Sequence, residues 1–93
     1  MKLIIDSKNN IICRTNLINN IDIVDAIQED IYNMYNKDSL WINSSMREIL
    51  EDIEVGTGFD ISLSPVDKNE ISISADNGLV IFDIIELESI KEL

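Results

Sequence analysis

Residues 59–85 read FDISLSPVDKNEISISADNGLVIFDII, and this stretch decides the fold because its apolar residues recur with the period of a β-strand. Apolar and polar residues alternate over 59–63 and again over 71–75, which predicts two strands that each bury one face. Asp76-Asn77-Gly78 follows the second of these segments and is a strong signal for a tight turn.

The segment after this turn, residues 79–85, is apolar except for Asp83 and predicts a central strand. We expect this strand to continue to about Leu87. An alternative is that Asp83 and Glu86 cap a short C-terminal helix that carries Ile84, Leu87 and Ile90.

Upstream of this stretch, the sequence predicts a β-hairpin and two amphipathic helices. β-Branched runs at 3–5 and 11–15 flank turn-forming residues and predict the hairpin. The first helix follows a cap at Asn19 or Asn20, and its apolar stripe consists of Ile23, Val24, Ile27, Ile31, Met34 and Tyr35. The second helix starts with a capping box at Ser45 and Glu48, ends at Gly56, and has an apolar face made of Met46, Ile49, Leu50 and Ile53.

The resulting order, β-β-α-α-β-β-β, predicts a single α+β domain that spans residues 1–93. Because hairpins dominate this order, we expect a mostly antiparallel sheet of about five strands with both helices packed on one face. The acidic sides of the two helices are then expected to share one outer surface. Leu79, Ile81 and Ile85 fall on one face of the sheet, and Val80, Phe82 and Ile84 fall on the other. Because the helices cover only one face, we expect a partner, a second copy of the chain or a C-terminal helix to cover the apolar row that remains.

The chain is strongly acidic. Its 93 residues include 18 acidic and 7 basic residues and no histidine, which gives a net charge of −11. This imbalance argues against direct binding to nucleic acid, because phosphate contacts need clustered Lys and Arg, and equally against an anionic membrane surface. It favours a basic protein as partner, with the alternative that the acidic surface serves solubility alone.

The sequence also bears on the compartment. The first residues do not resemble an export signal, and no apolar run approaches the ~20 residues that span a bilayer. We therefore expect a cytoplasmic protein. Cys13 is the single cysteine, and its apolar neighbours predict a small buried side chain in a strand.

Few residues offer catalytic or ligand-binding chemistry. The absence of histidine excludes Ser-His, Cys-His and His-metal sites. The three glycines form no phosphate-binding loop, and residues 67–70 lack the glycine and the distal glutamate of a calcium loop. The sequence therefore predicts a protein that is not an enzyme and that uses no cofactor and no metal ion.

Asp38-Ser39-Leu40 resembles the Asp-Ser-Leu tripeptide of acyl carrier proteins, in which the serine carries phosphopantetheine at the start of a helix. The small size and the acidity of the chain fit that family, whose fold is a four-helix bundle. The β-hairpin signals at both ends of this chain do not. The favoured interpretation is that Asp38 or Ser39 caps a turn between the two helices.

As a whole, the chain is similar to the small acidic immunity proteins of bacterial toxin systems, of the contact-dependent inhibition or colicin type. The resemblance covers size, charge, fold class and the lack of catalytic residues, and it includes no specific motif. It implies that the partner is a cognate toxin domain, often a nuclease, that the immunity protein neutralises inside the producing cell.

These considerations predict a protein-binding surface on the outer side of the helices. Acidic residues would supply the electrostatic field that attracts the partner, namely Asp22, Asp25, Glu29, Glu48, Glu51 and Asp52. Two aromatic residues, Tyr32 and Trp41, would anchor it. The alternatives are an ordinary solvated face for the carboxylates and a core position for Trp41. A nucleic-acid mimic, a carrier domain and a homodimer are other functions or assemblies that the sequence leaves open.

Overall fold

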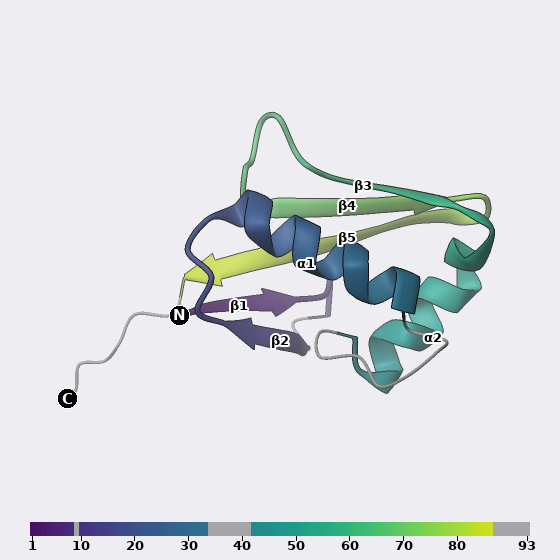
Figure 1. The fold of residues 1–93 in the computed structure, drawn as a ribbon, viewed down its shortest axis with the longest axis horizontal. Helices are drawn as coiled ribbons and strands as arrows, with labels where there is room; N and C mark the ends of the chain where they lie inside the picture. The colour runs from purple at the N-terminus through teal and green to yellow at the C-terminus, as the bar shows by residue number, and fades with distance from the viewer. Residues whose placement is uncertain (9, 34–41, 87–93) are drawn as a thin grey trace.

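The computed structural model describes residues 1–8, 10–33 and 42–86. The predictions made for Met34, Tyr35, Trp41 and the Asp38-Ser39-Leu40 tripeptide fall outside these residues. Within them, the chain forms an α+β fold: a five-stranded antiparallel sheet, two α-helices and a short 3-10 turn (Figure 1). The sheet rules out the four-helix bundle that a resemblance to acyl carrier proteins implies.

The sheet has the strand order β2-β1-β5-β4-β3, and every neighbouring pair is antiparallel. The predicted hairpin is formed by β1 (Lys2–Ile5) and β2 (Ile11–Thr15). The strands of the 59–85 stretch are β3 (Phe59–Leu63), β4 (Glu70–Ala75) and β5 (Gly78–Glu86). Because β5 pairs with β1 on one side and β4 on the other, the predicted central strand is confirmed, and it joins the two ends of the chain.

The strand β5 extends through Glu86, where the described part of the chain ends. Ile84, Ile85 and Glu86 pair with β1, so a C-terminal helix that begins at Asp83 is wrong for these residues. The prediction that the strand continues to Leu87 lies outside the described residues.

The first helix, α1 (Asn20–Asn33), begins where the sequence predicts. The side-chain Oδ1 of Asn19 accepts a hydrogen bond from the backbone N–H of Ile21 at 2.9 Å, so this end of the helix has a side-chain partner. The apolar stripe of Ile23, Val24, Ile27 and Ile31 is buried, as its spacing requires.

The second helix, α2 (Ser44–Asp52), corrects two predictions about its ends. Its cap is Asn43, whose Oδ1 accepts from the N–H of Met46 at 2.8 Å; the capping box at Ser45 is wrong because the cap lies two residues earlier. At the other end, the left-handed residue is Glu54, with φ 62°, and not Gly56. Gly56 lies instead inside the 3-10 turn η1 (Val55–Thr57).

The turn between β4 and β5 is set against the end of α2. Gly78 adopts φ 153°, and a Cβ atom on it would lie 3.1 Å from Cγ2 of Ile53. The N–H of Asn77 donates to the carbonyl of Ile53 at 3.2 Å. The glycine is therefore needed both for its backbone conformation and for this close approach.

Both helices pack on one face of the sheet and enclose the core, as predicted. The fully buried side chains come from strands and helices alike: Ile4, Ile23, Ile27, Met46, Leu50, Ile71, Ile73 and Phe82. Cys13 packs against this cluster in a half-buried position, and burial raises the pKa of its thiol. The core is thus built from aliphatic side chains around Phe82.

The other face of the sheet carries the second row of β5 side chains, as the sequence predicts. Leu79 is 61% exposed, Ile85 is also exposed, and Ile81 is half-buried. The neighbouring strand β4 contributes Ser72 and Ser74 to this face, so its apolar part is a strip along β5 and β1 and not the whole surface. No helix among the described residues is both long and apolar enough to cross a membrane.

The cap of α2 gives a direct test of its observed start. Asn43→Ala removes the acceptor for the Met46 N–H and should lower the free energy of unfolding by about 1 kcal/mol. Ser45→Ala is the matched control and should change it by less than about 0.5 kcal/mol, because Ser45 is exposed inside the helix. Urea denaturation of both variants measures the difference, and a larger loss for Ser45→Ala would place the cap where the sequence put it.

The turn between β1 and β2 predicts a dependence of stability on pH. Asp6 is 6% exposed, and its carboxylate accepts from the N–H groups of Lys8 and Asn10 at 2.8 and 2.9 Å and from the Asn10 amide at 3.1 Å. The hydrogen bond from the Asn10 backbone is the main cause that lowers the pKa of Asp6. The charged form therefore stabilises the fold at pH values above the unfolded pKa of about 3.9, and this contribution is lost as the pH falls through the folded pKa.

Asp6→Asn should accordingly lower the melting temperature at pH 7, and the gap to the unmodified chain should close as the pH falls below about 4. Thermal unfolding followed by circular dichroism between pH 3 and 7 measures this gap. Asp60→Asn, at an exposed position of β3, is the control and should leave the melting temperature at pH 7 nearly unchanged. A gap for Asp6→Asn that stays constant with pH would contradict a role for the charge.

Candidate functional site

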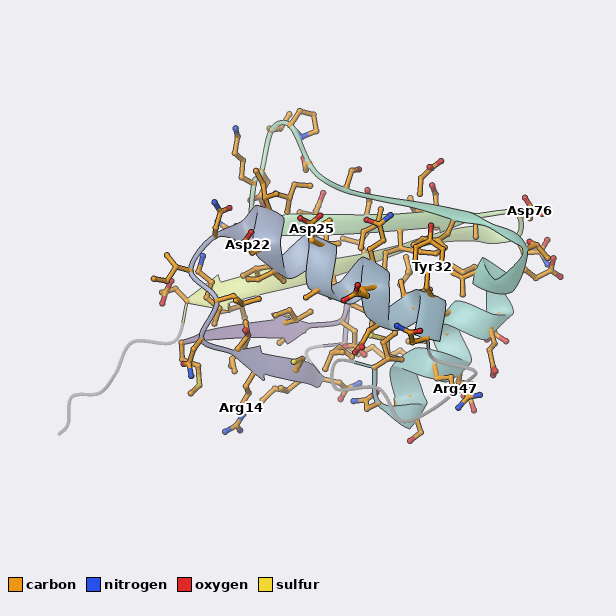
Figure 2. The ribbon with its side chains drawn as sticks, in the orientation of Figure 1. Arg14, Asp22, Asp25, Tyr32, Arg47 and Asp76 are labelled. Atoms are coloured by element: carbon orange, nitrogen blue, oxygen red, sulfur yellow. The ribbon has the colours of Figure 1, made fainter. Side chains whose placement is uncertain are left out.

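The exposed side of α1 presents three carboxylates in a line. Asp22, Asp25 and Glu29 are all exposed, and with Tyr32 they fall within an arc of about 80° for a helix of 3.6 residues per turn. Figure 2 shows Asp22, Asp25 and Tyr32 in succession along α1. Because the opposite side of this helix is locked into the core by Ile23, Val24, Ile27 and Ile31, the line has a fixed direction relative to the sheet.

Tyr32 is held in place although it is 65% exposed. Its ring lies against Phe59 at the start of β3, with 5.2 Å between the ring centroids and an angle of 49° between the planes. This tilted arrangement is one that aromatic pairs favour. The side chain therefore offers an ordered aromatic surface to a partner.

A hollow lies on each side of Tyr32. One, of about 270 Å³, is lined by Asp25, Gln28, Glu29 and Tyr32. The other, of about 340 Å³, is lined by Ile31, Tyr32, η1, Gly58 and Phe59. Tyr32 thus forms a ridge between an acidic hollow and a hollow walled by the backbone of residues 55–58. We call these residues of α1, η1 and Phe59 the Tyr32 surface.

Sequence reasoning identified Tyr32 as an exposed aromatic but missed Phe59 and η1, which complete the surface. Phe59 is more than 25 residues away in the chain, and its alternation with Asp60 indicates a buried strand position and nothing more. The antiparallel pairing of β3 with β4 and the packing of α1 on β3 bring it beside Tyr32. No local signal in the sequence announces that contact.

The predicted acidic residues of α2 form a second group. Glu48, Glu51 and Asp52 are exposed, as their positions opposite Met46 and Leu50 require. Glu51 forms an ion pair with Arg47 of the same helix, with 3.5 Å between Nε and Oε2, and both side chains are about half exposed. A surface pair of this kind contributes roughly 0–1 kcal/mol, but the guanidinium reduces the net negative charge of this group.

The two helices hold their carboxylates in different parts of the molecule. In Figure 1, α1 crosses the middle of the sheet and α2 lies toward one end, where it meets η1. The acidic residues therefore form two groups, one on each helix. Figure 2 labels Arg47, which belongs to the group on α2. Trp41, the second predicted anchor, is outside the described residues, so the structure places seven of the eight predicted residues, all of them exposed.

The open face of the sheet is the other candidate surface for a partner. Asp83 lies on β5 between two cross-strand neighbours, Ile5 of β1 and Glu70 of β4. Two carboxylates directly opposite each other repel, and the pair interrupts the apolar strip formed by Ile81 and Ile85. This face is less apolar than the sequence of β5 alone suggests.

The described residues contain no group of three or more carboxylate or cysteine side chains arranged to hold a metal ion. The chemistry available at the Tyr32 surface is that of charge and apolar contact: carboxylates that accept hydrogen bonds, and an aromatic face that can stack on a planar cation. No protein-family model matches the chain, and comparisons with curated proteins and with solved structures found no match either.

Proposed function

We propose that this chain is a non-catalytic binding protein that neutralises a basic bacterial toxin domain, a nuclease being the favoured class. The observation that carries the proposal is the Tyr32 surface: exposed carboxylates in line with an ordered, exposed aromatic side chain, in a protein with a net charge of −11. The proposed interface is the outer side of α1. The acidic group of α2 is the second proposed region of contact, and Trp41 stays a predicted anchor.

The acidic surface bears on the rate of binding. A nuclease needs a positive active site to hold phosphate groups, so an acidic surface of another protein is attracted to it. Opposite fields can raise the association rate constant from ~10⁵–10⁶ to ~10⁸ M⁻¹s⁻¹ or more at low salt. A fast encounter is the property that protection against a toxin inside the same cell requires.

Tyr32 bears on the lifetime of the complex. Charges at the solvent-exposed rim of an interface contribute little to the affinity, and the dissociation rate depends on a few buried anchors, among which Tyr, Trp and Arg are enriched. The contact with Phe59 restricts the Tyr32 ring before binding, so ordering this side chain costs less entropy on association. An arginine of the toxin could stack on the ring with its guanidinium near Asp25 or Glu29.

The proposal is tested first by finding the partner. The neighbouring upstream reading frame should encode a large secreted protein with a basic C-terminal domain, and that domain, purified separately, should bind this chain directly. If the neighbouring frames encode no such protein, or if the domain does not bind, the toxin assignment is wrong.

The interface is tested by charge reversal on each helix. With the basic domain in hand, Asp25→Lys together with Glu29→Lys should slow association about tenfold or more at low salt and flatten its salt dependence. Glu48→Lys together with Asp52→Lys makes the same change of charge on α2 and should have a smaller effect. Stopped-flow kinetics at 20 to 500 mM salt compares the two. A larger effect on α2 would move the interface there, and unchanged kinetics for both would point to the sheet.

The anchor is tested by truncation of the aromatic ring. Tyr32→Ala should raise the dissociation rate constant about thirtyfold, which corresponds to roughly 2 kcal/mol for a hot-spot residue, and leave association nearly unchanged. Tyr32→Phe keeps the ring and its contact with Phe59 and should change dissociation less than about fivefold. The melting temperatures of both free variants serve as the control for folding. Equal dissociation rates for the three proteins would exclude Tyr32 as an anchor.

A further inference from the structure

A third hollow lies at the opposite end of α1 from Tyr32. Its volume is about 460 Å³, and three segments meet around it: the start of β1, the residues that lead into α1, and the loop between β3 and β4. Figure 1 shows this loop rising beside the start of α1. The lining residues are Lys2, Ile18, Asn19, Asn20, Ile21, Leu63, Ser64, Pro65 and Lys68. We call this the Asn20 pocket.

Hydrogen bonds through Asn20 hold the three segments together. The Nζ of Lys2 donates to Oδ1 of Asn20 at 2.8 Å and to the carbonyl of Ile18 at 2.7 Å. The Nδ2 of Asn20 donates to the carbonyl of Lys68 at 2.7 Å and to Oδ1 of Asn69 at 3.1 Å. One side chain thus connects segments that are 18 and 48 residues apart in the sequence. The pocket is formed in the free protein, which lowers the cost of ordering it on binding.

The mouth of the pocket exposes aliphatic side chains. Ile18 is 86% exposed and Ile21 is also exposed; Val66 does not line the pocket but belongs to the same loop as Pro65 and is 94% exposed. Leu63 and Pro65 add apolar surface inside. Exposed aliphatic side chains are common singly, but a group of them around a preformed hollow marks an interaction site.

The charge of the pocket is opposite to that of the whole chain. Two of its lining residues are lysines and none is acidic, in a protein with 18 acidic and 7 basic residues. The Nζ of Lys2 donates to neutral acceptors, a carbonyl and an amide oxygen, and within the described part of the chain it forms no ion pair with a carboxylate. The backbone carbonyl of Lys68 accepts a hydrogen bond from Asn20. The side chain of Lys68 is exposed, and the residue lines the pocket. An occupant with a negative charge is therefore favoured at this place.

We propose that the Asn20 pocket binds a segment of a partner protein in which an aliphatic side chain lies next to a carboxylate. The aliphatic group packs on Ile21, Leu63 and Pro65, and the carboxylate pairs with Lys68 and Lys2. An anionic membrane fits less well, because a chain of net charge −11 is repelled by it. This inference goes beyond the proposed function and does not depend on it, since it concerns another surface and an occupant of opposite charge.

The test is a titration of the ¹⁵N-labelled full chain followed by NMR chemical shifts. The probe is the blocked peptide acetyl-Ile-Glu-Ile-amide, and acetyl-Ile-Lys-Ile-amide is its matched control. We expect the acidic peptide to bind in the millimolar range, with the largest shifts at the amides of 18–21 and 64–69, and the basic peptide to bind at least tenfold more weakly. Equal binding of the two peptides, or shifts located elsewhere, would overturn the proposal.

Substitutions separate the charge and the apolar contacts. Lys68→Glu should weaken binding of the acidic peptide tenfold or more, because it replaces a positive charge by a negative one. The pocket should keep its shape, because Asn20 bonds to the backbone carbonyl of residue 68, which the substitution leaves in place. Lys8→Glu makes the same change of charge in the turn between β1 and β2 and should change binding less than twofold. Ile21→Ser should weaken binding of the acidic peptide about fivefold; because Ile21 is exposed, the protein should stay folded, which its ¹⁵N spectrum checks.

The chain offers one competing occupant, since residues 87–93 contain Leu87, Ile90 and Leu93 together with Glu88 and Glu92. Lys2 lies opposite Glu86 in the register of β1 and β5, and residues 87–93 follow Glu86 in the sequence. A chain that ends at Glu86 should bind the acidic peptide with the same affinity as the full chain. If only the shortened chain binds, the occupant is this segment and the assignment to a partner protein is wrong.

Discussion

The fold depends on the pairing of β5 with strands from both ends of the chain. This strand runs between β1 and β4, and its inner row, Val80, Phe82 and Ile84, lies under the helices. Phe82 is fully buried and belongs to a core cluster that contains side chains from α1, α2, β1 and β4. Removing β5 would therefore separate the N-terminal hairpin from the rest of the sheet and open the core at its centre. The loop-closure entropy of joining residues 2–5 to 83–86 is one conformational cost that this pairing must offset, besides the entropy of ordering the paired residues.

The same strand determines where function can be located. Because the inner row of β5 holds both helices on one face, the outer sides of α1 and α2 face solvent with fixed directions. The core is aliphatic, with Asp6 as the buried charged side chain among the described residues, so the carboxylates of the helices remain at the surface. Their number makes the surface negative in any arrangement. The order of Asp22, Asp25, Glu29 and Tyr32 along one helix gives this charge a direction.

The period of the apolar residues was sufficient to predict the fold class and nearly every strand. Alternation places Ile71 and Ile73 inside, and a stretch of unbroken apolar residues is enough to identify β5 as central. The ends of α2 were not predictable in this way, because Asn43, Ser44 and Ser45 are all good caps, and the choice depends on where the buried Met46 and Leu50 must point. Glu54 takes a left-handed conformation that sequence rules assign to glycine, which a tertiary context can impose at a cost of roughly 1–3 kcal/mol.

The surfaces were less predictable than the core for a physical reason. Burial leaves a periodic record in the sequence, whereas a contact such as Tyr32 with Phe59, or the hydrogen bonds of Asn20 with Lys2 and Lys68, joins residues that carry no shared pattern. Tyr32 follows Ile21 by eleven positions in α1, which is roughly 16 Å along the helix axis. The Asn20 pocket and Tyr32 therefore lie at opposite ends of one helix. A uniformly acidic surface attracts a basic partner in many orientations. Two sites of opposite charge at a fixed distance allow only one orientation of the partner. The positive pocket would therefore supply the specificity for one partner that net charge alone does not provide.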